Sequence, residues 1–280
     1  MPSFSPSRDA IEVQLATSRD LADLAHEIRY EAYRARGYIG ERADGLFSDE
    51  EDTRENAQTA VVFRDGIPSG TVRALLLDPG SDNPDFHHIP ALDMFGPEIR
   101  ELLAVRGTAA RPATAIEATK LALASHAERD IAVLQALFRT VRYLVHAHDA
   151  NVVFNAVKHH HMPFYRRLGY RNIEDPRPYP GLAVQAGLMA CFREEFADTV
   201  DRVPFMSGLS VTDLPLQALR AGHLVRIVST GPPDERRWSK TPNRRGRADF
   251  APAPDGGKES GLGWAERCDN PRTENQYFDP

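Results

Sequence analysis

The sequence predicts an α/β fold in which a mixed, twisted sheet is flanked by helices. Within the first 200 residues, short apolar stretches of strand length alternate with longer stretches that have apolar residues at helical spacing. The 280 residues are 41% hydrophobic and 26% charged, which is enough apolar material for a substantial core. No run approaches the roughly 18 unbroken apolar residues of a membrane span, so no span is expected.

Each element follows from its local pattern. Alternating or continuous apolar residues predict strands at residues 11–15, 58–63, 70–77, 115–122, 151–157 and 184–191. Arg64-Asp65-Gly66 predicts a hairpin turn between the second and third of these strands. Helical spacing predicts a first helix capped by Ser18, a short helix at 98–105, a long helix over 131–144 and a helical turn at 163–168.

The composition changes after residue 204. Residues 231–263 contain eleven Gly or Pro in 33 positions, with basic clusters at 236–240 and 244–247, and such a stretch cannot pack a core. Before it, residues 213–228 predict one short helix. We therefore expect a folded domain over residues 1–204 and a low-complexity, disordered tail over residues 205–280.

The cysteines, the N-terminus and the net charge exclude several classes of protein. Cys191 and Cys268 cannot form a disulfide framework, and neither lies at a metal-ligand spacing. The first residues have no apolar signal core, so a cytoplasmic protein is expected. The net charge of −6 argues against general nucleic-acid binding.

Charge is unevenly distributed along the chain. Residues 41–55 carry seven acidic and two basic residues, whereas residues 129–177 carry eight basic and four acidic residues. Two interpretations remain open: both segments are solvated surfaces, or their opposite charges mark two partner surfaces.

Five segments together resemble a known enzyme family. They are Arg29-Tyr30-Glu31-Ala32-Tyr33 with Gly37-Tyr38, Gly70-Thr71-Val72-Arg73, Glu117-Ala118-Thr119-Lys120, His161-Met162-Pro163-Phe164-Tyr165-Arg166-Arg167-Leu168-Gly169-Tyr170 and Pro178-Tyr179-Pro180-Gly181. In this order the chain resembles the N-acyl amino acid synthases, which are relatives of the acyl-homoserine lactone synthases, over about residues 12–192. The resemblance implies the GNAT acyltransferase fold.

The resemblance also indicates the acyl donor. In ordinary acetyl-CoA-dependent GNAT enzymes, a glycine-rich loop and a helix N-terminus hold the CoA pyrophosphate. Residues 123–130 contain no glycine and place Glu128 and Asp130 there. The resembled families take the acyl group from acyl carrier protein through its phosphopantetheine arm, so acyl carrier protein is the expected donor and partner. Acyl-CoA remains the alternative donor, and no cofactor is expected to be bound.

An acidic carrier protein requires a basic docking surface. The basic segment 129–177 falls on the elements that flank the expected donor channel, and the expected docking residues are Arg139, Arg142, Arg166 and Arg167. The apolar residues of 78–113 form either a wall for a long acyl chain or an additional packing layer over the sheet.

Two residues are expected to be catalytic. Glu117 lies in an otherwise apolar strand, where a carboxylate is unusual, and the resemblance places this position at the reaction centre. It would deprotonate the amine directly or through water, the alternative being a structural partner for an arginine. Tyr165 aligns with a tyrosine that assists the leaving thiolate in many GNAT enzymes, the alternative being a packing residue. Because no Cys or Ser stands beside a plausible base, direct attack on the thioester is expected.

The resemblance assigns Arg29 and Arg73 to an acidic cluster that shapes the amine-substrate pocket. The candidate partners are Asp49, Glu50 and Asp52, and the run Asp49-Glu50-Glu51-Asp52 leaves open which of them pair with the arginines. Either arginine could instead bind the substrate carboxylate or form a purely structural ion pair. Strand alternation places Lys120 opposite Glu117, so it is expected to face solvent or the carrier.

The consecutive residues His159-His160-His161 cannot all coordinate one ion, so no metal is expected. His161 is expected to cap or orient the following helix.

These observations predict an N-acyltransferase that transfers a long-chain fatty acyl group from acyl carrier protein to the α-amine of an amino acid. Three alternatives remain. One is an acyl-homoserine lactone synthase, disfavoured because Tyr33 and Tyr38 stand where those enzymes usually have Phe and Trp. The others are a CoA-dependent N-acetyltransferase and a non-catalytic acyl-carrier-binding module.

Overall fold

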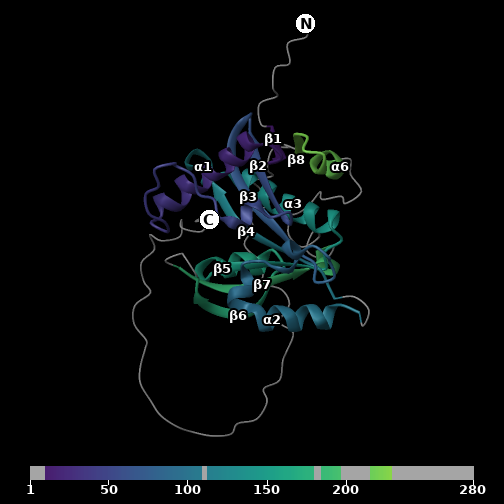
Figure 1. Ribbon diagram of the computed structural model, residues 1–280. Coiled ribbons are helices and arrows are strands. Elements are labelled where there is room, and N and C mark those ends of the chain that lie inside the picture. The colour runs from purple at the N-terminus through teal and green to yellow at the C-terminus, as the bar shows by residue number, and fades with distance from the viewer. Residues whose placement is uncertain (1–9, 109–111, 180–183, 197–214, 229–280) are drawn as a thin grey trace, which may run out of the picture. The chain divides into compact units, whose positions relative to one another are not determined.

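The computed structural model describes residues 10–108, 112–179, 184–196 and 215–228. Their strands form one mixed sheet with the order β6-β7-β5-β4-β3-β2-β1-β8 (Figure 1). The strands are β1 (Ile11–Leu15), β2 (Ala57–Arg64), β3 (Ile67–Leu77), β4 (Ala115–Leu123), β5 (Val152–Lys158), β6 (Arg171–Pro178), β7 (Gln185–Phe192) and β8 (Val225–Val228). The helices are α1 (Arg19–Ala35), α2 (Ala91–Arg106), α3 (Ile131–Ala147), α4 (Met162–Arg167) and α6 (Pro215–Arg220).

The sheet has one parallel pairing at its centre. Strands β1 to β4 form an antiparallel series, and the long helix α3 connects β4 to β5, which runs parallel to it. Strand β7 pairs antiparallel with both β5 and β6. The β4–β5 pairing covers only Ala115–Glu117 against Val152–Phe154, although both strands continue beyond it. The two central strands therefore diverge after Glu117.

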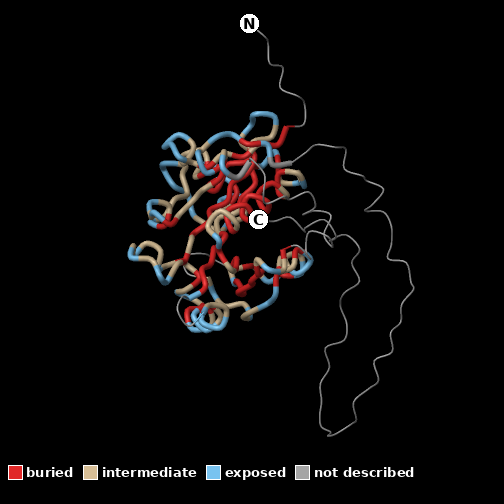
Figure 2. The backbone as a smooth tube through the Cα atoms, turned by 90° about the vertical axis from the view of Figure 1, so that its right-hand side faces the viewer, coloured by how far each residue is buried: buried red, intermediate tan, exposed pale blue. Residues whose placement is uncertain are grey.

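The helices cover both faces of the sheet. Val61 packs in a cluster with Ala25 and Ile28 of α1, whereas its neighbour Val62 packs in the cluster that contains much of α3. Because successive strand residues point to opposite faces, α1 and α3 lie on opposite sides. Figure 2 shows the buried residues concentrated in the strands and in the helix faces against them.

Helix α2 covers the α1 face of the sheet at its other end. Phe95 and Ile99 of α2 pack in a cluster with Leu75 of β3 and Phe154 of β5. The apolar residues of segment 78–113 thus form a packing layer over the sheet, which was one of the two interpretations of this segment. The helix is longer than the expected 98–105 and is kinked at Phe95, two residues before Pro97.

The expected α/β class and the flanked mixed sheet are confirmed. Ser18 caps α1, since its Oγ accepts a hydrogen bond from the backbone N–H of Leu21 at 3.4 Å. Two strands were not anticipated from the sequence. Strand β6 is a polar edge strand containing Pro176 and three charged residues near its end, a composition that protects sheet edges and hides the strand pattern.

The second unanticipated strand lies beyond the expected domain boundary at residue 204. The single helix expected over 213–228 is instead the short helix α6, a turn at Gly222 with φ of 76°, and strand β8. Strand β8 pairs with β1 and extends the sheet, and Leu219 and Val225 are buried in the core cluster. The folded unit therefore includes residues 215–228; the rest of the expected tail lies outside the described residues.

No helix among the described residues is both long enough and apolar enough to cross a membrane.

Candidate active site

Two cavities occupy the place where β4 and β5 diverge. The first lies beside Glu117 and Tyr179, and the second lies beside His161 and Tyr165. They share walls formed by Tyr33, Ala118, Thr119, Lys120, Ala156 and Lys158. The backbone pairing of the two strands has ended here, and the Asn155 side chain of β5 donates instead from Nδ2 to the Ala118 carbonyl oxygen of β4 at 2.8 Å. Side chains of both strands can therefore face a bound molecule. The divergence brings the expected catalytic residues Glu117 and Tyr165 to the two ends of one divided site.

Glu117 is the buried acid of this site. It is fully buried, and its Oε2 accepts a hydrogen bond from the backbone N–H of Ala91 at 2.9 Å. Its Oε1 is buried and has no hydrogen-bond partner within the described part of the chain. Burial raises the pKa of Glu117 to about 7, although the Ala91 hydrogen bond and the charge of Arg73 act in the opposite direction. An acid with this pKa can accept a proton near neutral pH.

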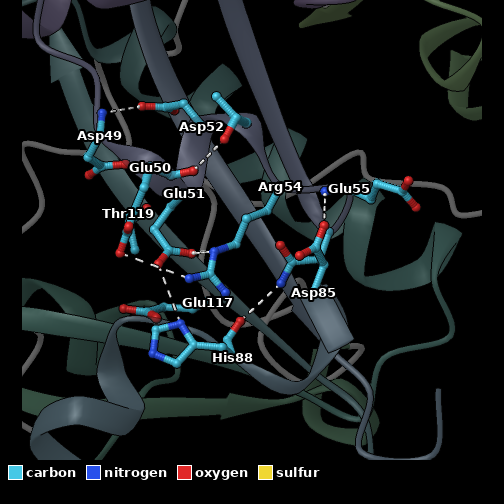
Figure 3. A network of polar contacts seen from close by, with 12 residues as sticks. Asp49, Glu50, Glu51, Asp52, Arg54, Glu55, Asp85, His88, Glu117 and Thr119 are labelled. Carbon is cyan, nitrogen blue, oxygen red and sulfur yellow. Dashed lines mark hydrogen bonds and ion pairs between the residues drawn. The ribbon is translucent and has the colours of Figure 1, made fainter. Parts of the chain in front are cut away.

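The expected acidic cluster is present, and Asp52 is its centre. Arg29 Nη1 lies 2.8 Å and Arg73 Nη1 lies 3.0 Å from Asp52 Oδ1, and all three side chains are buried. Burial favours the neutral acid, but a hydrogen bond from His26 and the charges of Arg29 and Arg73 outweigh it and hold the pKa of Asp52 well below its usual range. Asp52 also caps its own turn, because its Oδ2 accepts a hydrogen bond from the Asp49 N–H at 3.1 Å (Figure 3).

Asp49 joins this cluster to the cavity. It forms a bidentate ion pair with Arg73 and lies 3.1 Å from Lys120 Nζ. Arg73 also donates from Nε to Thr119 Oγ1 at 3.1 Å, and Thr119 lines both cavities. Neither Arg29 nor Arg73 lines either cavity, so the structure places them behind the site and not against a substrate carboxylate. Glu50, in the same turn, points outward with 84% of its side chain exposed.

A second polar group lies on the other side of the same turn. The buried Glu51 is 3.0 Å from Arg54 Nε and 3.4 Å from His88 Nδ1 (Figure 3). Burial raises the pKa of Glu51, and its charge in turn contributes to the raised pKa of Glu117. Glu51 is therefore close enough to influence the buried acid electrostatically.

The expected outward orientation of Lys120 is wrong. Between Arg73 and Thr71, strand β4 contains one more residue than β3, and Lys120 has a left-handed backbone with φ of 52°. This bulge interrupts the alternation and turns the side chain inward, where Nζ lies 4.0 Å from the centroid of the Phe47 ring. Burial lowers the pKa of Lys120, against the charge of Asp49.

Tyr165 and His161 form the end of the second cavity. The Tyr165 ring packs against Phe138 and Tyr170, with centroids 5.4 and 5.1 Å away. Burial raises the pKa of Tyr165, so its hydroxyl is protonated at neutral pH. His161 occupies the N-cap position of α4 but makes no side-chain capping bond, so the expected capping role is wrong. Its ring lines the cavity instead, and burial lowers its pKa to about 3.

The four expected docking arginines divide into two pairs. Arg166 and Arg167 are exposed on α4. Arg139 and Arg142 are each only 6% exposed, and Arg142 packs against the Phe196 ring at 4.5 Å. A docking residue must reach the partner, so the expected docking role of Arg139 and Arg142 is wrong: both are interior residues.

The described cysteine does not suit nucleophilic chemistry. Cys191 is buried in the core, and burial raises the pKa of its thiol to about 12, so it cannot supply a thiolate nucleophile near neutral pH. Cys268 lies outside the described residues. Within the described ranges, no group of three or more His, Cys, Asp or Glu side chains could hold a metal ion.

Sequence reasoning missed three side chains that line the first cavity: Lys120, Lys158 and Tyr179. Tyr179 belongs to one of the five matching segments, which was the available signal for it. Lys158 ends a strand directly before three histidines, and nothing local indicates that β4 and β5 diverge beside it.

Comparison with known proteins shows the family and the fold of this chain. The family profile described as "N-acyl amino acid synthase FeeM" matches residues 24–191. The structure of FeeM from uncultured soil microbes is similar, with a TM-score of 0.57, 16% identity, and coverage of 71% of this chain and 99% of that one. No curated protein sequence matches.

Two lactone synthase structures are similar at lower scores. MesI, a CoA-dependent acyl-homoserine lactone synthase, has a TM-score of 0.48 at 15% identity, covering 71% of this chain and 97% of that one. The acyl-homoserine lactone synthase LasI has a TM-score of 0.46 at 16% identity, covering 65% and 90%. The likeness to FeeM confirms the expected fold.

Proposed function

The chain belongs to the N-acyl amino acid synthase FeeM family, and we propose that it transfers a fatty acyl group from acyl carrier protein to the α-amine of an amino acid. It is an acyltransferase. The observation that carries the proposal is Glu117, a fully buried acid on the cavity wall with an unpartnered oxygen and a pKa raised to about 7. Transfer to an amine needs such a base, because an amino acid's α-amine is largely protonated at neutral pH.

The reaction proceeds by direct attack. Glu117 accepts a proton from the ammonium group, either directly or through a water molecule, and the neutral nitrogen attacks the thioester carbonyl carbon. As the C–S bond of the tetrahedral intermediate breaks, the nitrogen gives up its second proton and a neutral amide forms. Tyr165, at the far end of the site, donates a hydrogen bond or proton to the departing thiolate, and the second proton of the nitrogen, passed through water, leaves with the thiol or restores the Tyr165 hydroxyl. Glu117 then releases the first proton to water. The buried and protonated Cys191 supports a route without an acyl-enzyme.

The N-terminus of α3 supports a carrier protein as the donor. Asp130 Oδ1 accepts hydrogen bonds from the N–H groups of Ala132 at 2.9 Å and Val133 at 3.2 Å. These are the groups that would bind a CoA pyrophosphate at a helix N-terminus. The Asp130 carboxylate occupies these N–H groups, and its negative charge repels a pyrophosphate, so it weakens CoA binding. It does not affect the uncharged part of a phosphopantetheine arm. The exposed Arg166 and Arg167 provide a docking surface for an acidic carrier.

The test is incubation of the purified full-length chain with long-chain acyl carrier protein, the matching acyl-CoA, acetyl-CoA and a mixture of the twenty amino acids. Mass spectrometry is expected to detect an N-acyl amino acid, formed faster from the carrier donor. Absence of any N-acyl product from folded protein contradicts the proposed synthase. Preference for acetyl-CoA favours an N-acetyltransferase, and carrier binding without turnover favours a binding module.

A further inference from the structure

The hydroxyl of Thr119 belongs to the wall that the two cavities share. Thr119 follows Glu117 by two positions in the regular part of β4, so both side chains lie on one face of the strand, about 7 Å apart along it. The first cavity extends to Glu117 and the second to Tyr165. Under the proposed function these ends receive the amine and the thioester sulfur, so the new C–N bond forms along the wall between them.

The Thr119 hydroxyl has a proton to offer. Among the described residues its oxygen makes one hydrogen bond, as the acceptor of the Arg73 Nε–H at 3.1 Å. A hydroxyl group has two lone pairs and one proton, so this contact leaves the proton without an acceptor in the described part of the chain. Because the side chain is half-buried and lines both cavities, the proton is available to a bound molecule.

Arg73 makes this hydroxyl a stronger donor. Its side chain is 1% exposed and is fixed by the bidentate ion pair with Asp49 and by Asp52 at 3.0 Å. A hydroxyl that accepts a hydrogen bond from a fixed cation is polarised and donates more strongly in turn. The ion-pair cluster thus holds Thr119 in one orientation and directs positive charge toward the cavities from behind.

The spacing along β4 suits a developing oxyanion. When the amine nitrogen bonds to the thioester carbonyl carbon, one electron pair of the C=O bond moves onto oxygen. That oxygen lies two bonds from the nitrogen, so a nitrogen held by Glu117 places it roughly 5 Å from the carboxylate, within reach of a hydroxyl farther along the same face. A donor already in place at this point stabilises the tetrahedral intermediate.

We infer that the Thr119 hydroxyl donates a hydrogen bond to the thioester carbonyl oxygen as that oxygen becomes negatively charged. No proton is transferred in this contact, and the electron pair re-forms the C=O bond when the C–S bond breaks. Arg73 is a positioning residue that acts through Thr119. This inference rests on the proposed function and adds to it the side chain that stabilises the intermediate.

The chain offers a matched control in Thr59 of β2. Its Oγ1 accepts a hydrogen bond from Nη2 of Arg29 at 2.9 Å, and Arg29 belongs to the same ion-pair cluster as Arg73. Thr59 lines neither of the two cavities. Thr59→Val therefore removes the hydroxyl partner of a buried arginine, as Thr119→Val does, but takes no donor from the site.

The experiment measures the single-turnover rate of N-acyl product formation with long-chain acyl carrier protein and a saturating amount of the amino acid that the mass-spectrometric screen selects. Thr119→Val and Thr119→Ala should both lower this rate about 10²–10³-fold, because both lack the donor. Thr119→Ser should retain most of it, and Thr59→Val should stay close to wild type. Carrier-protein binding, measured by calorimetry, should be unchanged in all four variants.

Three results would overturn the inference: a wild-type rate in Thr119→Val or Thr119→Ala, an equal loss in Thr59→Val, or no recovery in Thr119→Ser. A higher KM for the amino acid with an unchanged rate at saturation would also overturn it, since the hydroxyl would then bind the acceptor. Absence of product with folded wild-type protein contradicts the proposed function itself, before any variant is compared.

Discussion

Glu117 accepts a hydrogen bond from the backbone N–H of Ala91, the first residue of α2, while its second oxygen is buried without a partner. One oxygen is thus held in position, and the other carries no hydrogen bond in a residue that lines the first cavity. The arrangement explains how a segment that is mainly a packing layer also serves the site. Helix α2 orients the acid but does not neutralise it.

Replacement of Glu117 by Gln should abolish most turnover while leaving the fold intact. The amide keeps the shape and can still accept the Ala91 hydrogen bond, but it cannot accept the proton of the amine. We expect kcat to fall by about 10²–10⁴-fold, measured as N-acyl product per unit time. Carrier-protein binding, measured by calorimetry, should be unchanged. Full activity in Glu117→Gln would rule out Glu117 as the base.

The pH dependence of activity should reveal the same group. Glu117 must be ionised to act as a base, and its pKa is raised to about 7. The wild-type kcat/KM should therefore rise about tenfold per pH unit below pH 7 and level off above it. Glu117→Gln should lack this limb in its residual activity. A wild-type profile that is flat between pH 5 and 7 would contradict the assignment.

The buried acid should also make stability depend on pH. Between about pH 4.5 and 7 the unfolded state has released the Glu117 proton and the native state still binds it, so this group's contribution to the free energy of unfolding falls as pH rises. Relative to wild type, Glu117→Gln should therefore gain up to about 3 kcal/mol between pH 4.5 and pH 8. Urea unfolding of both proteins at the two pH values measures this difference. An unchanged difference across this range would show that Glu117 is not buried as a neutral acid.

The aspartate cluster predicts a strong stability effect at one position and none at its neighbour. Asp52→Asn removes the charge that Arg29 and Arg73 share, leaving two buried guanidinium groups with less compensation, and should cost about 3–5 kcal/mol in urea unfolding. Glu50→Gln, in the same turn, changes an exposed acid and should remain within about 0.5 kcal/mol of wild type. Equal effects would contradict the cluster's structural role.

Carrier docking should depend on the exposed arginines of α4. Reversing both charges with Arg166→Glu and Arg167→Glu should raise the KM for acyl carrier protein at least tenfold, since electrostatic attraction speeds encounter with an acidic partner. The KM for a small acyl-pantetheine thioester should stay near the wild-type value. Arg19→Glu serves as the matched reversal elsewhere on the surface. An equal rise for both donors would exclude this docking surface.

Much of the fold was predictable, because local patterns reflect local physics. Apolar alternation located the strands that became β1 to β5 and β7, and helical spacing located α1 and α3. Strand β6 escaped because edge strands carry charges and proline, which mask the alternation. Strand β8 escaped because its pairing with β1 joins residues more than 200 positions apart, which no local pattern records.

The candidate site divides in the same way. Local patterns were enough to find a carboxylate in an apolar strand at Glu117, and arginines and aspartates at Arg29, Asp49, Asp52 and Arg73. The three-dimensional structure was needed to show which of them pair, that a bulge turns Lys120 inward, that Arg139 and Arg142 are interior, and that Lys158 lines the cavity beside Glu117. The physical reason is that residue type and spacing act over a few positions, whereas burial and ion pairing depend on where β4 and β5 cease to pair and what packs against them.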